Sequence, residues 1–364
     1  MKATAAVFMG PNVPFAIREF DVLPAPKGYG RSDLIACGVC GTDIHIHRGK
    51  LGTGYPSIIG HEFIGRLTDL DEEDGKKFGL KKGDCVIADI AVPCGECLLC
   101  RTGDDANCVN MKVTNGGSVD TPPYLYGGYA EVNFTPLTNL IRVPDELDPT
   151  MTAVFACPGP TILHAVRLAE QAGVDLKQVH TAVVQGFGPV GCFAVACLKA
   201  MGVEKVSLIT ATMTEEKKAL AKKLGADAVY DLASQGKDAV TSALQQENGG
   251  LGVDLCIEAS GAPTAFPQGM NILRNRGVYL VPGQYSNSGG IEIQPQLITF
   301  KAIHLIGSSQ YSVCDVKAYL DFLAAHPELH AAIRSLATCY KVADVNAAFD
   351  DAKARRNVKT LLVR

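Results

Sequence analysis

The segment Thr181-Ala182-Val183-Val184-Gln185 runs directly into Gly186-Phe187-Gly188-Pro189-Val190-Gly191. The first five residues are largely apolar, as is typical of strands buried in a parallel sheet. The glycines follow the pattern G-x-G-x-x-G, and the small residues of 192–201 predict a helix immediately after them. At such a turn glycine permits close backbone approach, and the helix N-terminus faces a pyrophosphate. The stretch therefore predicts a dinucleotide-binding turn made by Gly186, Gly188, Pro189, Val190 and Gly191.

Strands and helices alternate from about residue 158 onward. Helices are expected at 163–172, 215–224 and 316–325, and strands at 205–209, 253–258, 277–283, 302–307 and 360–363. This alternation predicts an α/β fold with a doubly wound parallel sheet. Residues 1 to about 155 instead contain short strand candidates broken by glycine and proline, at 1–8, 15–20, 64–67 and 85–88. The acidic run 69–74 between the last two candidates is interpreted as a solvated loop.

The end of the 205–209 strand bears on the choice of cofactor. It continues into Thr210-Ala211-Thr212-Met213-Thr214, and no carboxylate occurs before Glu215. A cofactor with a free ribose 2′-hydroxyl usually contacts an aspartate or glutamate at this place. Thr210 and Thr212, followed by Lys217, would instead tolerate a 2′-phosphate. We therefore expect NAD(P) binding with a lean toward NADP, the alternative being that Lys217 only covers a helix surface.

A second pair of motifs predicts a metal site. Cys40-Gly41-Thr42-Asp43-Ile44-His45 is followed about twenty residues later by Gly60-His61-Glu62. Zinc binds cysteine sulfur and histidine nitrogen in tetrahedral geometry, and a catalytic site keeps one position open. Cys40 and His61 supply two ligands, and the best candidate for a third is Cys157. Each of these residues alone is more often a packed core residue, but the two motifs in this order favour catalytic zinc.

Four further cysteines form a compact motif. Cys94, Cys97, Cys100 and Cys108 have the spacing C-x2-C-x2-C-x7-C. Four thiolates this close can complete a tetrahedral zinc shell, which leaves no position for a substrate. Such a zinc is structural, and its binding stabilises a lobe with little core of its own. An iron–sulfur cluster also uses four cysteines and is the weaker alternative. The two motifs together predict two zinc ions per chain.

Length and composition exclude several other classes of protein. A chain of 364 residues favours two domains, and 47% hydrophobic with 20% charged residues is typical of a soluble globular protein. The net charge of −4 gives no electrostatic case for nucleic acid or an anionic membrane, and no apolar run is long enough to cross a bilayer. Thirteen cysteines without an export signal indicate a reducing compartment, so we expect a cytoplasmic protein.

With both metal motifs and the glycine-rich turn considered together, the chain resembles the zinc-dependent alcohol dehydrogenases of the medium-chain dehydrogenase/reductase superfamily. The resemblance covers essentially the whole length. It implies a β-rich, GroES-like catalytic domain made of 1–157 and 303–364, and a Rossmann domain made of 158–302. It also implies that Cys40, His61 and Cys157 bind the catalytic zinc, although polyol-type relatives use a glutamate at the third position.

The resemblance suggests roles for several neighbouring residues. Glu62 would lie behind the zinc, and Asp43 would accept a hydrogen bond from the far nitrogen of His61. Thr161 would lie against the nicotinamide and Lys359 near the pyrophosphate. In the mechanism we expect, Thr42 takes the proton from the reacting hydroxyl. His45 then passes this proton to solvent, as suits a side chain whose unperturbed pKa is about 6.5.

The expected reaction is reversible hydride transfer between a small-molecule alcohol, secondary or cyclic, and NAD(P), giving a ketone or aldehyde. Two alternatives remain open at this point. One is a metal-free enoyl or quinone reductase of the same fold, against which the three zinc ligands argue. The other is a zinc-dependent binding or regulatory protein, against which the acidic balance argues. The resemblance also implies a homo-oligomer, either a dimer or a tetramer.

Overall fold

The computed structural model describes residues 1–115 and 117–364, which form two compact units. The first unit consists of Met1–Pro160 with Gln310–Arg364, and the second of Thr161–Ser309. Both changes of unit come later in the chain than the expected domain boundaries at 157/158 and 302/303. The second comes later because strand β15 (His304–Gly307), which the expected boundary assigned to the catalytic domain, pairs with β14 (Leu273–Val281) and completes the parallel sheet.

The second unit contains a six-stranded sheet in the order β12-β11-β10-β13-β14-β15, and every neighbouring pair is parallel. This is the strand order of the doubly wound dinucleotide-binding fold, so the predicted fold class is confirmed. The central strand is buried along its whole length, in agreement with its apolar sequence. This central strand is β10 (Thr181–Gln185), and the other strands of the sheet include β11 (Lys205–Thr210), β12 (Ala228–Asp231) and β13 (Val253–Glu258).

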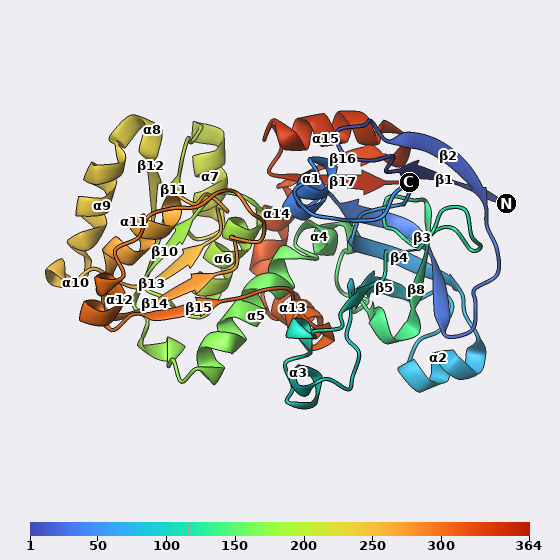
Figure 1. Ribbon diagram of the computed structural model, residues 1–364, viewed down its shortest axis with the longest axis horizontal. Helices are drawn as coiled ribbons and strands as arrows, with labels where there is room; N and C mark the ends of the chain where they lie inside the picture. Colours follow the sequence, from blue (N-terminus) through green and yellow to red (C-terminus); the bar gives the residue numbers. More distant parts are fainter. Residues whose placement is uncertain (116) are drawn as a thin grey trace. The chain divides into compact units, whose positions relative to one another are not determined.

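Helices flank this parallel sheet, with α9 toward one side and α6 toward the other (Figure 1). The helix expected after the glycine-rich turn is α6, which packs on β10 and β11. The helical segments that connect or extend the strands are α5 (Pro158–Gln171), η3 (Leu176–Gln178), α6 (Pro189–Ala200), α7 (Glu215–Lys223), α8 (Leu232–Gln235), α9 (Lys237–Gln245), α10 (Glu247–Gly250), α11 (Ala265–Ile272) and α12 (Gln296–Lys301).

The first unit is β-rich, as expected. Its main sheet has the order β16-β17-β3-β4-β5-β9, with β8 paired to β3, and two small sheets pair β1 with β2 and β6 with β7. The strands are β1 (Lys2–Val7), β2 (Ala16–Asp21), β3 (Tyr29–Gly38), β4 (Glu62–Asp69), β5 (Cys85–Ala88), β6 (Ala91–Val92), β7 (Lys112–Val113), β8 (Val132–Pro136), β9 (Leu140–Arg142), β16 (Ala337–Lys341) and β17 (Lys359–Val363). Because β17 pairs with β3, a segment from the far end of the sequence lies beside the first strands.

Short helices connect the strands of this unit. They are α1 (Gly41–His47), α2 (Glu72–Phe78), α3 (Leu98–Arg101), η1 (Asp105–Asn107), η2 (Leu137–Asn139), α4 (Pro149–Val154), α13 (Val313–Ala325), η4 (Pro327–Leu329), α14 (His330–Arg334), η5 (Val342–Asp344) and α15 (Val345–Lys353). The interpretation of 69–74 as a loop was wrong for its second half, where α2 begins. Asp71 caps α2 by accepting from the backbone N–H of Glu73 and Asp74, and Gly79 ends the helix in the left-handed conformation.

Within residues 1–115 and 117–364, no helix is both long enough and apolar enough to cross a membrane. The α5 helix, for example, has 14 residues, whereas a span needs roughly 20 apolar ones.

Candidate active site

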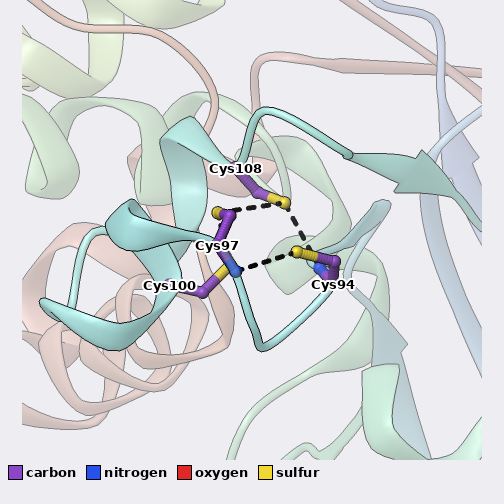
Figure 2. A group of neighbouring side chains, drawn as sticks. All are labelled: Cys94, Cys97, Cys100 and Cys108. Atoms are coloured by element: carbon purple, nitrogen blue, oxygen red, sulfur yellow. Dashed lines mark hydrogen bonds between the residues drawn. The ribbon is translucent and has the colours of Figure 1, made fainter.

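The four cysteines of the compact motif converge in the first unit (Figure 2). Their sulfur atoms all lie within 4.8 Å of one another, with 3.5 Å between Cys97 and Cys100 and 3.9 Å between Cys97 and Cys108. A tetrahedral zinc shell with bonds of about 2.3 Å places its sulfurs roughly 3.8 Å apart. The short α3 helix, which begins at Leu98, brings Cys97 and Cys100 to the same side of the loop. The spacing of the sulfurs therefore fits a closed metal shell.

Backbone groups of this lobe favour thiolates. The N–H groups of Cys100 and Val109 lower the pKa of Cys97 to about 6, and those of Glu96 and Cys97 lower the pKa of Cys94. The Sγ of Cys108 accepts from the backbone N–H of Cys94 at 3.2 Å. Burial raises the pKa of the remaining thiol, Cys100, to about 12. A cation that binds thiolates would displace the remaining protons and offset the repulsion between the sulfurs.

The second cluster brings together Cys40, His61, Glu62 and Cys157, again with ligand atoms within 4.8 Å of one another. Cys40 caps α1, and His61 directly precedes β4, whose first residue is Glu62. Cys157 directly precedes α5. The structure thus assembles the three residues that the sequence indicated as zinc ligands, from positions 117 residues apart at the extremes. Glu62 is added to this set as a fourth close donor.

The charges in this cluster match a zinc site. A hydrogen bond with Cys157 lowers the pKa of Cys40 well below its usual value, and the same hydrogen bond raises the pKa of Cys157. Burial opposes protonation of His61, but Asp43 and the Cys40 thiolate outweigh it and raise the pKa of the imidazole. A divalent cation would take the place of the protons on these donors. Two soft sulfurs and one imidazole are a donor set that zinc prefers.

Asp43 supports the cluster from behind. It is completely buried, and its Oδ2 accepts from the backbone N–H of Cys40 at 2.9 Å and from the hydroxyl of Tyr129 at 2.8 Å. Its Oδ1 lies 3.3 Å from Nδ1 of His61. The contact between Asp43 and His61 agrees with the sequence expectation. The sequence did not indicate Tyr129. The two glycines before it are a signal that the backbone there packs closely on its neighbours, since a Cβ at Gly128 would lie 2.6 Å from Cys37 Sγ.

Glu62 forms a buried ion pair with Lys359. The sheet order β17-β3-β4 places the two side chains above Gly38, where a Cβ would overlap the Glu62 carboxylate and lie 2.7 Å from Lys359 Cε. Only glycine at position 38 leaves room for the pair. The resemblance placed Lys359 near a pyrophosphate, whereas its amine lies in the interior, with 1% of the residue exposed. Its contact in the structure is the Glu62 carboxylate.

Removing one partner of this pair should be strongly destabilising. Lys359→Met leaves the Glu62 carboxylate buried without a counter-charge, and we expect it to lower the free energy of unfolding by about 3–5 kcal/mol. The double variant Lys359→Met/Glu62→Gln should recover most of this loss, because no uncompensated charge remains. Urea unfolding of the purified variants measures both effects, with Lys82→Met, which removes an exposed ion pair to Asp69, as the control. Equal stability of Lys359→Met and Lys82→Met would contradict the expected cost.

Thr42 and His45 lie three residues apart in α1, hence on one helix face. Cys40 Sγ and Thr42 Oγ1 lie within hydrogen-bonding distance, 3.7 Å apart, so this hydroxyl lies beside the metal cluster. His45 is half-buried, and burial, with Lys50 and Arg48 nearby, lowers its pKa. Its imidazole is therefore mainly neutral at pH 7 and able to accept a proton. The two residues occupy suitable places for the expected proton path.

The glycine-rich turn lies between β10 and α6, as the sequence predicted. Gly186 has a φ of +108°, and Gly188 is the N-cap of α6, with open space where a Cβ would stand. A Cβ at Gly191 would overlap the carbonyl oxygen of Gly186, so the helix approaches the strand closely only with glycine there. Pro189 and Val190 form the first turn of α6, where backbone N–H groups point outward. The turn has the features of a phosphate cradle.

A pocket of the second unit adjoins the ends of β10 and β11. Its lining includes Gln185, Gly186, Thr210 and Lys237. The Thr210 hydroxyl donates to the carbonyl of Thr212 at 3.1 Å, while Thr212 is exposed and Lys217 lies in the first turn of α7. Lys237, at the start of α9, is a basic residue of this pocket that the sequence analysis did not identify.

A carboxylate on the neighbouring strand β12 contacts the backbone of the adjoining loops. Asp231 pairs with Thr210 across β11 and β12. Its two oxygens accept from the backbone N–H groups of Met213 and Ala233. The carboxylate is therefore engaged in shaping the loops after both strands. Thr161, the remaining predicted residue, lies in the first turn of α5, four residues after Cys157.

A buried carboxyl group in the first unit gives the stability a pH dependence. Burial raises the pKa of Asp89 from 3.8 to about 7. The stabilisation associated with the protonated form is complete below pH 3.8 and is lost as the pH rises through 7. In Asp89→Asn the amide oxygen can still accept from Ala91 N–H. The free energy of unfolding of the variant, relative to that of the parent protein, should rise by about 2 kcal/mol between pH 5.5 and pH 8. Urea unfolding at the two pH values measures this change. A difference in the free energy of unfolding that stays constant between pH 5.5 and 8 would refute this prediction.

A doubly wound sheet with a phosphate-binding turn, together with a Cys/His/Cys cluster in a β-rich unit, defines a class of protein: the zinc-dependent dehydrogenases that use a nicotinamide nucleotide. Residues 33–145 match the alcohol dehydrogenase GroES-like domain family, and residues 189–325 match the zinc-binding dehydrogenase family. The chain belongs to the zinc-type alcohol dehydrogenases of the medium-chain superfamily.

Individual relatives agree with this assignment. Erythritol/L-threitol dehydrogenase of Mycolicibacterium smegmatis is 32% identical over 296 residues, which are 79% of this chain and 77% of the relative. 5-exo-Hydroxycamphor dehydrogenase of Pseudomonas putida is 32% identical over 317 residues, which are 84% of this chain and 83% of the relative. The crystal structure of an alcohol dehydrogenase from Thermotoga maritima superposes with a TM-score of 0.90 at 26% identity, covering 100% of this chain and 99% of that one.

The family and the reaction class predicted from the sequence are therefore confirmed. The protein is an NAD(P)-dependent alcohol dehydrogenase that uses zinc, and its substrates are small molecules. The comparisons favour this function over a metal-free reductase and over a regulatory zinc protein.

Proposed function

We propose that the protein oxidises a secondary or cyclic alcohol at a zinc ion held by Cys40, His61 and Cys157. The convergence of these three donors within 4.8 Å, from three separate segments of the first unit, is the observation that carries the proposal. Zinc bound there would act as a Lewis acid toward the oxygen of the alcohol. Glu62 would not bind the zinc as long as its carboxylate is paired with Lys359.

The protein's own residues would control the proton of the alcohol. Thr42 Oγ1 accepts the hydroxyl proton of the substrate and donates its own proton onward. His45, on the same face of α1 and mainly neutral at pH 7, receives the proton and releases it to solvent. A bound nicotinamide would accept the carbon-bound hydrogen as hydride, so one alcohol and one oxidised cofactor would give one ketone or aldehyde, one reduced cofactor and one proton.

The cofactor would bind on the second unit. Gly186, Gly188, Pro189, Val190 and Gly191 receive the pyrophosphate, and Thr161 contacts the nicotinamide. For the adenosine end we propose a preference for NADP, with Thr210, Thr212 and Lys217 near the 2′-phosphate. Lys237 supports this preference because it adds a positive charge to the pocket that Thr210 lines. The ratio of kcat/KM for NADP and NAD tests it, and a ratio that clearly favours NAD would rule it out.

The substrate proposal rests on the relatives. Their names specify erythritol or threitol in one case and a hydroxylated camphor in another. Both compounds carry secondary hydroxyl groups, one in an open polyol and the other on a ring. A screen of acyclic polyols, cyclic secondary alcohols and primary alcohols at matched concentration tests the choice. Faster turnover of simple primary alcohols than of both other groups would contradict it.

A second zinc would be structural and bound by Cys94, Cys97, Cys100 and Cys108. Metal content by mass spectrometry, with nicotinamide turnover assayed before and after chelation, tests both sites together. Two zinc ions per chain, with activity lost as one leaves, is the expected result. One zinc, with chelator-insensitive reduction of enones or quinones, would instead indicate a metal-free reductase.

Two further properties complete the proposal. We expect a homo-oligomer, a dimer or a tetramer, and light scattering coupled to gel filtration measures its mass. We also place the protein in the cytoplasm, since its cysteines include two sets suited to metal binding, which depends on reduced thiols. Fractionation of the source cells tests this location.

A further inference from the structure

The hydroxyl of Tyr129 contacts Asp43, the residue behind the metal cluster, rather than one of the four residues of the cluster itself. It donates to Asp43 Oδ2 at 2.8 Å, and the backbone N–H of Cys40 donates to the same oxygen at 2.9 Å. The other oxygen, Oδ1, lies 3.3 Å from His61 Nδ1, and no other donor among the described residues reaches it. All of Tyr129 and Asp43 is buried. The two donors thus fix one carboxylate oxygen and leave the other to face the imidazole.

This arrangement determines which nitrogen of His61 is available. A carboxylate oxygen at Nδ1 favours the tautomer with a proton on that nitrogen, so the lone pair is on Nε2. The Asp43 carboxylate orients the His61 ring, so the ring is fixed only if the carboxylate is itself fixed. Asp43 has little freedom to rotate, because turning its carboxylate would break the bonds from both Tyr129 and the Cys40 backbone.

The ring and backbone of Tyr129 hold the segment that carries His61. The Tyr129 backbone N–H donates to the carbonyl of Ile59 at 3.0 Å. Its ring lies directly on Gly60, where a Cβ would overlap it, and packs edge-on against Phe349 at 5.9 Å between centroids. One tyrosine therefore contacts both ligand-bearing segments: its ring and backbone touch the Ile59–His61 side, and its hydroxyl touches Asp43.

We propose that Tyr129 is a positioning residue of the metal centre, whose hydroxyl fixes the Asp43 carboxylate and thereby orients the ligand His61. The inference rests on the proposed function, because it takes Cys40 and His61 to be metal ligands. Groups that orient a metal-bound histidine typically change metal affinity by 10–100-fold when removed. Tyr129→Phe removes the hydroxyl and keeps the ring on Gly60, so it isolates the hydrogen bond to Asp43.

The test measures how fast zinc leaves the purified protein in excess chromogenic chelator. Tyr129→Phe should release the zinc of the Cys40 cluster roughly 10–100-fold faster, while the zinc of the four-cysteine lobe leaves at the parent rate. The matched control is Tyr279→Phe, which removes another buried hydroxyl, bonded to Gln185 at 2.9 Å in the second unit. It should change the Tm by a similar amount and leave both zinc release rates unchanged.

A double-mutant cycle separates positioning from general loosening. If Tyr129 acts through Asp43, adding Tyr129→Phe to Asp43→Asn should cause little further acceleration, whereas independent effects would multiply. Asp43→Asn alone should also accelerate release, which keeps the inference testable if Tyr129→Phe does not fold. A Tyr129→Phe release rate within twofold of the parent, or full multiplication in the double variant, would overturn the inference and leave the proposed function intact. A parent protein without zinc in the Cys40 cluster would overturn the proposed function and this inference with it.

Discussion

Replacement of Cys157 by serine should remove one of two zinc ions per chain and lower turnover by several orders of magnitude. A serine hydroxyl is a poor zinc ligand at neutral pH, because it remains protonated where a thiol ionises. Among the described residues, Cys40 and His61 would then be left with Glu62 as their one other close donor, and that carboxylate is paired with Lys359. Metal analysis and alcohol-dependent reduction of the cofactor measure both losses.

A buried cysteine outside both clusters gives the control for this variant. Cys85→Ser, in β5 of the same unit, should retain both zinc ions and most of the activity, at a modest cost in stability. Two zinc ions in Cys157→Ser would show that another residue, with Glu62 as the first candidate, completes the site. Loss of both ions would indicate that the whole unit had unfolded.

Thr42→Ala should leave the zinc content unchanged and lower kcat roughly 10²–10⁴-fold, the usual contribution of a positioned proton acceptor. The hydroxyl lies beside the cluster, 3.7 Å from Cys40 Sγ, and no ligand is lost with it. Because the missing group acts on the transferred proton, KM should change less than kcat. Steady-state kinetics with a saturating cofactor provide the measurement.

Thr42→Ser is the informative companion, since it keeps a hydroxyl in the same helical position. It should recover most of the lost kcat, whereas an effect due to packing alone would not be rescued by the smaller side chain. Near-parent turnover in Thr42→Ala would remove this residue from the mechanism. The proton would then have to reach His45 by another route.

The parts of the site that could be predicted from the sequence are those encoded locally. The glycine-rich turn and the four-cysteine lobe each lie within a short stretch, and their residue types have few other uses. The helix α2 was also readable, because Asp71 is an N-cap, acidic residues fill the first turn, and Gly79 follows the last. It was missed because the acidic run was taken as a mark of solvation alone.

Long-range contacts could not be predicted in this way. Lys359 reaches Glu62 across 297 positions only because β17 pairs with β3, and nothing in the residues around 359 specifies that strand partner. Tyr129 contacts Asp43 across 86 positions in the same manner. Strand β15 was placed in the wrong unit for a related reason, since its sequence does not show that it pairs with β14. The motifs predicted the chemistry of the site, and sheet pairing determines which residues support it.

The different spans of the two cysteine-containing clusters set an order for their assembly during synthesis. The four-cysteine lobe is complete within fifteen residues, so its loop closes at small entropic cost as soon as Cys108 has emerged. The other cluster must wait for Cys157, which a ribosome adds roughly 2–10 s later at typical rates. In that interval Cys40 and His61 have been synthesised, but the third proposed ligand of their cluster, Cys157, has not. A nascent chain should therefore be able to bind zinc at the four-cysteine lobe before the Cys40 cluster is complete.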